Sequence, residues 1–164
     1  MSKTFNVNLS FIESEYFKNE LEKYLKFIFE IDLNIRAILL FGSVATGKAR
    51  NDDEHLSDID LVVISDDLPK DLKDRKRMVL DLTRSVSSGI QVLWLTSQEL
   101  KEQVNSKFYL VLDAFDEGII LFDPENFLYA QRKKLFKDLK KKGVIKTELY
   151  WQWPKKKFGE KFEY

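Results

Sequence analysis

Residues 39–48 read LLFGSVATGK, and residues 57–63 read SDIDLVV. The first apolar run covers residues 35–41, has the length of a buried β-strand and stops at Gly42. The second apolar run, over residues 58–64, predicts another strand. Because only a short polar loop separates the two strands, we expect them to be antiparallel neighbours in a mixed sheet.

Two carboxylates interrupt the second strand. Asp58 and Asp60 are two residues apart, so on a strand both side chains point to the same face, about 6–7 Å apart along the backbone. Two unpaired carboxylates on one face repel each other, and a bound cation would offset that cost. The chain has no cysteine, and His55 is its one histidine, so the hard cation Mg²⁺ is the natural candidate.

The turn after the first strand has the composition of a phosphate-binding site. Gly42 allows the backbone to approach a phosphate closely, and free N–H groups at the start of a helix bind anions. Ser43 adds a hydroxyl donor, and Lys48 lies just beyond. A phosphate site beside a two-carboxylate metal site is the apparatus of phosphoryl or nucleotidyl transfer, in which the metal neutralises the triphosphate and the leaving pyrophosphate.

This order of apolar strand, Gly-Ser, polar loop and Asp-apolar-Asp resembles the signature of the DNA polymerase β-type nucleotidyltransferases, and among them the small stand-alone archaeal and bacterial proteins. The strong likeness covers residues 35–96, and a softer one covers residues 150–163. The resemblance implies an α/β (α+β) nucleotidyltransferase fold, with a small mixed sheet of about three to four strands flanked by helices and a helical C-terminal extension. It also implies transfer of a nucleoside monophosphate from an NTP, with ATP expected, and a requirement for Mg²⁺ or Mn²⁺.

The resemblance also assigns the site residues and the partners. By that pattern Gly42 and Ser43 would bind the nucleotide phosphates, and Asp58 and Asp60 would bind the metal and carry the catalysis; the position of Lys48 just beyond the turn adds it to the expected phosphate site. The acceptor hydroxyl would belong to a small molecule, a protein or RNA.

A third carboxylate usually stands on the next strand in this family. Here that strand covers residues 90–95, and Gln91 is its only polar residue. An amide can offer an oxygen to a metal, but it has no charge and cannot accept a proton. A second interpretation therefore stays open, in which the chain is a catalytically degenerate nucleotide-binding protein or an antitoxin-like partner of a helical toxin.

The rest of the chain predicts further helices and strands around these two runs. The predicted helices cover residues 10–31, 69–86, 97–104, 107–116 and 123–143, and the predicted strands cover residues 90–95 and 119–122. We expect residues 1–100 to form the nucleotidyltransferase core. We expect residues 101–164 to form a helical extension with an aromatic, basic tail, packed on the core as one compact unit.

Charge and hydropathy restrict the remaining function classes. The net charge is zero, but residues 126–164 alone carry a net charge of +8, interleaved with aromatic residues. A nucleic-acid-binding module in this part of the chain is therefore a third interpretation.

The longest apolar runs are far shorter than the ~20 residues of a membrane-spanning helix, and the first residues lack a signal-peptide pattern, so we expect a soluble cytoplasmic protein. The aromatic face of the first helix could serve a homodimer.

Overall fold

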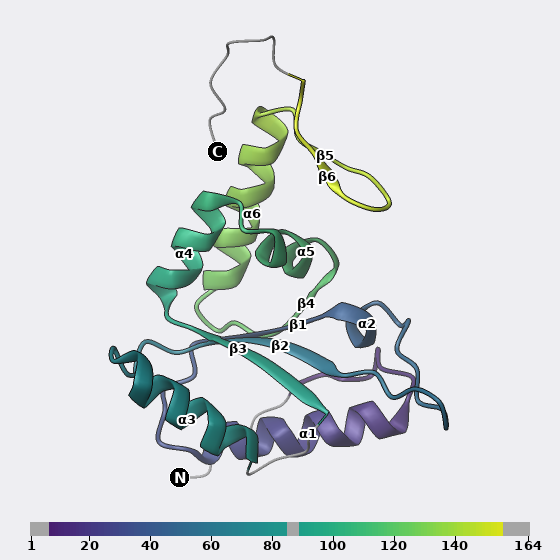
Figure 1. Cartoon of the computed structure of the whole chain (residues 1–164), viewed down its shortest axis with the longest axis vertical. Helices are drawn as coiled ribbons and strands as arrows, with labels where there is room; N and C mark the ends of the chain where they lie inside the picture. Colours follow the sequence, from purple (N-terminus) through teal and green to yellow (C-terminus); the bar gives the residue numbers. More distant parts are fainter. Residues whose placement is uncertain (1–6, 85–88, 156–164) are drawn as a thin grey trace.

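The computed structural model of the chain describes residues 7–84 and 89–155 (Figure 1). Its centre is a four-stranded sheet in the order β3-β2-β1-β4. Neighbouring strands are antiparallel except for β2 and β3, which are parallel. The predicted mixed sheet and the antiparallel pairing of its first two strands are thus confirmed. The strands are β1 (Ala37–Phe41), β2 (Ile59–Ile64), β3 (Ile90–Leu95) and β4 (Ile119–Phe122).

Helices cover both faces of the sheet, with α1 and α3 on one side and α4, α5 and α6 on the other (Figure 1). A single turn, α2, follows β1, and a small hairpin of β5 and β6 follows α6. None of the helices in the described part of the chain combines the length and apolar character needed to cross a membrane. The remaining elements are α1 (Glu15–Glu30), α2 (Gly42–Ala45), α3 (Leu72–Arg84), α4 (Ser97–Ser106), α5 (Tyr109–Glu117), α6 (Phe127–Lys141), β5 (Ile145–Lys146) and β6 (Trp151–Gln152).

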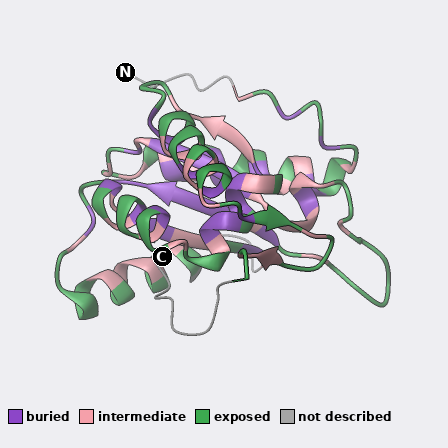
Figure 2. Ribbon diagram, turned by 90° about the horizontal axis from the view of Figure 1, so that it is seen from above, coloured by how far each residue is buried: buried purple, intermediate pink, exposed green. Residues whose placement is uncertain are grey.

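Alternation along the central strands builds two hydrophobic cores. In β1, Ile38 and Leu40 pack toward α1, whereas Leu39 packs toward α5 and α6, and all three are buried. Figure 2 shows the buried residues gathered on the strands and on the inner sides of the helices. In β2, Val62 and Ile64 face the second core. Asp60 continues their row, so the carboxylate pair lies at the edge of that second core.

The first helix begins at Glu15, later than the residue 10 that its apolar pattern predicts. Residues 9–12 form a turn instead, in which the Ile12 N–H donates to the Leu9 carbonyl at 3.1 Å, and Ser14 precedes the helix. Apolar spacing alone does not distinguish this turn from a helical one, because the turn also buries Leu9 and Ile12.

The third helix also starts late, at Leu72. The Asp71 carboxylate accepts the backbone N–H groups of Lys73 and Asp74, which fixes the helix start after residue 69. Its predicted end at residue 86 lies outside the described residues, as does the part of the tail likeness beyond residue 155.

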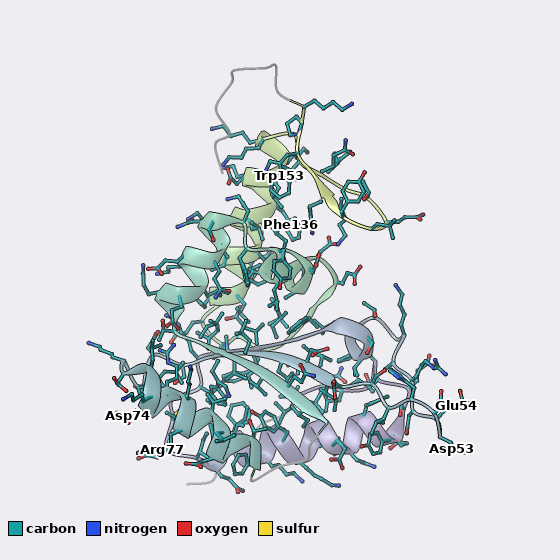
Figure 3. All side chains as sticks on the ribbon, viewed as in Figure 1. Asp53, Glu54, Asp74, Arg77, Phe136 and Trp153 are labelled. Atoms are coloured by element: carbon teal, nitrogen blue, oxygen red, sulfur yellow. The ribbon has the colours of Figure 1, made fainter. Side chains whose placement is uncertain are left out.

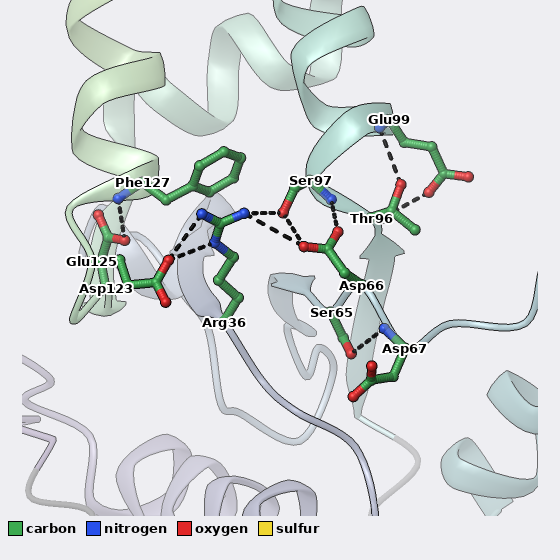
Figure 4. A network of polar contacts seen from close by, with 10 residues as sticks. All are labelled: Arg36, Ser65, Asp66, Asp67, Thr96, Ser97, Glu99, Asp123, Glu125 and Phe127. Carbon is green, nitrogen blue, oxygen red and sulfur yellow. Dashed lines mark hydrogen bonds and ion pairs between the residues drawn. The ribbon is translucent and has the colours of Figure 1, made fainter.

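Arg36, just before β1, ties the sheet to α4 and α6 (Figure 4). Its guanidinium donates to Ser97 Oγ at 2.7 Å, pairs with Glu125 at 2.9 Å and stacks 4.3 Å from the centre of the Phe127 ring. Asp66, just after β2, accepts both the N–H and the hydroxyl of Ser97 at 2.7 Å. This cluster fixes the end of the sheet opposite to the acidic pair.

Candidate functional site

Gly42 and Asp60 meet where β1 ends and β2 begins. Phe41 lies opposite Asp60 in the antiparallel register, and Gly42 follows with φ +73°. A Cβ atom at position 42 would overlap Asp60 Oδ2 and lie 3.3 Å from its Cγ. The Asp60 carboxylate therefore occupies the space that any side chain at position 42 would need. Both the left-handed φ and this close approach require glycine.

The turn formed by α2 is fastened by a residue that sequence reasoning missed. The Thr46 hydroxyl donates to the carbonyl of Gly42 at 3.1 Å and lies 3.3 Å from that of Ser43. The Lys48 N–H donates to the Ser43 carbonyl at 2.9 Å, while the Lys48 side chain is exposed. These bonds keep Ser43 and Lys48 close to Gly42. The signal in the sequence was a threonine four residues after the glycine, at the spacing of one helical turn.

The two carboxylates lie on the same side of the sheet at the start of β2, where Gln91 of β3 lies beside Asp60 and bonds to Asp58. Asp58 is exposed just before the strand, and Asp60 is half-buried within it. Burial raises the pKa of Asp60, and the negative charge of Asp58 raises it further. Ionised Asp60 and Asp58 therefore repel each other, and a cation bound between them would reduce that repulsion.

Gln91 reaches the same face from β3. It lies beside Asp60 in the parallel register, and its Nε2 donates to Asp58 Oδ2 at 2.6 Å. The structure thus places Gln91 at the edge of the acidic pair, where the sequence predicted a substitute for a third carboxylate. Its observed contact uses the amide as a donor to Asp58, a role that the sequence did not predict.

The loop between the two halves of the motif folds as a small hairpin of its own. Arg50 pairs with Asp52 at 3.0 Å, and the Arg50 N–H donates to the Ser57 hydroxyl at 2.9 Å. Asp53 and Glu54 project from its outer tip, away from the sheet (Figure 3). Its acids and the exposed His55 therefore belong to a solvated loop.

The donor set of the site fits a magnesium ion bound by few protein ligands. Within residues 7–84 and 89–155, no group of three or more His, Cys, Asp or Glu side chains could hold a metal. Mg²⁺ is commonly held by one or two carboxylates, with waters and substrate phosphates completing its coordination. Asp58 and Asp60, which already repel each other, match that requirement.

One protein family model matches more than half of this chain. The polymerase β nucleotidyltransferase family model matches residues 16–125. No curated protein matches the chain.

Several solved structures are similar to the chain. One is a toxin–antitoxin structure with AMP-PNP, with 19% identity over 76% of this chain and 87% of that chain, at a TM-score of 0.43. A second is the tri-AMPylated Shewanella oneidensis HEPN toxin in complex with MNT antitoxin, with 18% identity over 77% of this chain and 89% of that chain, at a TM-score of 0.42. A third is the toxin–antitoxin MntA-HepT, with 16% identity over 78% of this chain and 88% of that chain, at a TM-score of 0.42.

The family match spans the sheet from β1 to β4 and includes the Gly-Ser turn, both aspartates and Gln91. It confirms the resemblance that the motif carries and agrees with the mixed sheet around the site. The chain belongs to the polymerase β nucleotidyltransferase family.

Proposed function

We propose that this protein transfers a nucleoside monophosphate from an NTP, ATP being the expected donor, to an acceptor hydroxyl with the aid of Mg²⁺. The observation that carries the proposal is the close fit of the Asp60 carboxylate against Gly42, beside Asp58. That fit supports a metal site at Asp58 and Asp60 directly beside the Gly42 turn, whose backbone a phosphate can approach. Family membership supports the same reaction class.

Each site residue has a role in this proposal. Asp58 and Asp60 would hold the metal, which supplies neutralisation of the triphosphate and of the leaving pyrophosphate. Gly42 and Ser43 would receive the phosphates, and the exposed Lys48 ammonium would add a positive charge. The acceptor hydroxyl gives its proton to solvent water, and its oxygen forms a bond to the α-phosphorus. The bond from that phosphorus to the bridging oxygen breaks, and pyrophosphate leaves with that electron pair.

Labelled nucleotide transfer tests the proposal. The protein is incubated with Mg²⁺ and α-labelled ATP, GTP, CTP or UTP, together with the RNA, protein and small-molecule fractions of a cell extract. We expect label in one fraction, with loss of transfer in Asp58→Asn and Asp60→Asn. Asp53→Asn, which removes the same charge from the loop tip, should transfer normally. Transfer that survives both site substitutions would refute the proposal.

Gln91 supports a second candidate function, a nucleotide-binding protein without turnover that acts as an antitoxin-like partner of a toxin. Its amide donates to Asp58 and cannot take the acceptor's proton, so this position provides no base. Gln91→Glu keeps the side-chain length and supplies a carboxylate. If Gln91→Glu creates transfer that the natural protein lacks, while both bind ATP, the second candidate is favoured. Full activity of the natural protein, with no gain in Gln91→Glu, removes its basis.

A further inference from the structure

The outer face of α6 carries an uncompensated row of positive charge, which we call the α6 lysine row. The helix lies on the side of the sheet opposite to α1 and α3 (Figure 1), and all side chains of the row are exposed. The members of the row are Lys133, Lys134, Lys137, Lys140 and Lys141.

The acid of α6, Asp138, interacts mainly with Lys107, although its charge also attracts Lys141. Asp138 accepts a hydrogen bond from the largely buried Lys107 at 2.5 Å and lies 3.8 Å from Lys142. That bond is the main reason why the pKa of Asp138 lies below its ordinary value. Among the described residues, no carboxylate forms an ion pair with any member of the row, and Lys134 donates only to the neutral Asn105 amide, at 3.0 Å.

The spacing of the row suits a chain of phosphates. Lys133, Lys137 and Lys141 are four residues apart, so each step advances about 6 Å along the helix axis on nearly the same side. Tyr129, with 58% of its surface exposed, lies one turn before Lys133 on that side. An exposed aromatic ring beside a row of cations can stack on an unpaired base.

A protein partner matches this face less well. The centres of protein–protein interfaces are depleted in lysine and depend on buried aromatic or arginine anchors. Every exposed residue of α6 from Lys133 to Lys141 is a lysine, so the row offers no exposed apolar anchor. A polyphosphate chain needs only closely spaced cations, because its affinity comes chiefly from the release of counterions.

We propose that the α6 lysine row, with Tyr129, binds single-stranded nucleic acid through its phosphates, at a site separate from the Gly42–Asp60 edge. The proposal does not depend on nucleotidyl transfer, because binding is measured without NTP. In the part of the chain that the structure describes, no side-chain hydrogen bond or ion pair engages four of the exposed lysines, which are Lys133, Lys137, Lys140 and Lys141. If these four neutralise phosphates, the logarithm of affinity should fall with the logarithm of salt with a slope of about −2.8. Affinity would then drop roughly 50-fold between about 50 and 200 mM salt.

Fluorescence anisotropy with labelled oligouridylate and oligothymidylate tests this on the full chain. We expect the quadruple variant with Gln at the four lysines to lose most of the binding and nearly all of the salt slope, while its thermal unfolding stays normal. The matched control replaces four exposed lysines on the opposite side of the sheet by Gln and should bind normally; these are Lys26, Lys70, Lys73 and Lys76.

Three results would overturn the proposal. The first is unchanged binding by the quadruple variant, and the second is an equal loss in the matched control. The third is equal competition by polyglutamate, which would assign the row to acidic proteins. Tyr129→Leu separates the two contacts, because it should weaken binding of the single strand and leave the salt slope in place. Equal affinity for a duplex of the same length would argue against base stacking and refute the assignment to single strands.

Discussion

Replacing Gly42 by alanine should abolish nucleotide binding, while the same change at Gly47 should not. Both glycines have left-handed backbones, with φ +73° and +70°. Alanine at either position lowers the free energy of unfolding by about 1–2 kcal/mol, because its Cβ atom disfavours that conformation. In a chain of this size, each kcal/mol lowers Tm by about 2–4 °C, so both variants should lose several degrees.

The two positions differ only in what the new methyl group meets. At position 47 nothing lies within 4 Å, whereas at position 42 the methyl group overlaps Asp60 Oδ2. In Gly42→Ala the Asp60 carboxylate must therefore rotate away from its place beside Asp58. The cost of the left-handed conformation is the same in both variants, so a difference in ligand binding reports on the crowded space between position 42 and Asp60.

Thermal unfolding with and without Mg²⁺-ATP measures this difference. A ligand at 100 times its Kd adds about 2.7 kcal/mol of stability, which raises Tm by roughly 5–10 °C. We expect this increase in the natural protein and in Gly47→Ala, and none in Gly42→Ala. An equal increase in all three proteins would refute the assignment of Gly42 and Asp60 to the nucleotide site.

Three further substitutions test charges at other points of the structure. Because the pKa of Asp60 is raised in the fold, its ionisation destabilises the protein as pH rises above the ordinary carboxyl range. Thermal scans across pH should therefore show that Asp60→Asn raises Tm at neutral pH but not at acidic pH. The pKa of Asp138 is lowered, so its stabilisation is present at neutral pH and is lost as pH falls through that lowered value. Because Asp138 is partly exposed and solvent screens its bond to Lys107, Asp138→Asn should cost about 1 kcal/mol in urea unfolding at neutral pH and little in strong acid; a pH-independent cost would contradict this reasoning. Arg36→Met keeps the packing on Phe127 but removes the bonds to Ser97 and Glu125. It should cost about 2–3 kcal/mol in urea unfolding and leave the ATP-induced Tm increase intact, since it lies at the far end of the sheet.

The sequence predicted the centre of the sheet well because its signals there are strong and local. The apolar runs that became β1 and β2 are buried on both sides, and the alternation of Asp58 and Asp60 with apolar residues places both carboxylates on one face. Helix starts were less predictable. The first helix depends on a turn at Leu9 that follows the same apolar spacing, and the third depends on the Asp71 carboxylate.

The contact of Gln91 could not be predicted from the sequence. It depends on the parallel register of β2 and β3, which sets Gln91 beside Asp60, and on a side-chain rotamer that brings Nε2 to Asp58. The close approach of Asp60 to Gly42 likewise arises from the antiparallel register of β1 and β2. The sequence identifies these residues as candidates, but the register of the paired strands determines which of their atoms are in contact.

A crystal of the natural protein grown with Mn²⁺ and a non-hydrolysable ATP analogue gives the most direct test of the site. Anomalous scattering then locates the metal without reference to any assay of turnover. The structure leads us to expect one Mn²⁺ held by both Asp58 and Asp60, with the triphosphate against Gly42 and Ser43. Manganese bound elsewhere, or a triphosphate distant from that turn, would contradict the central claim.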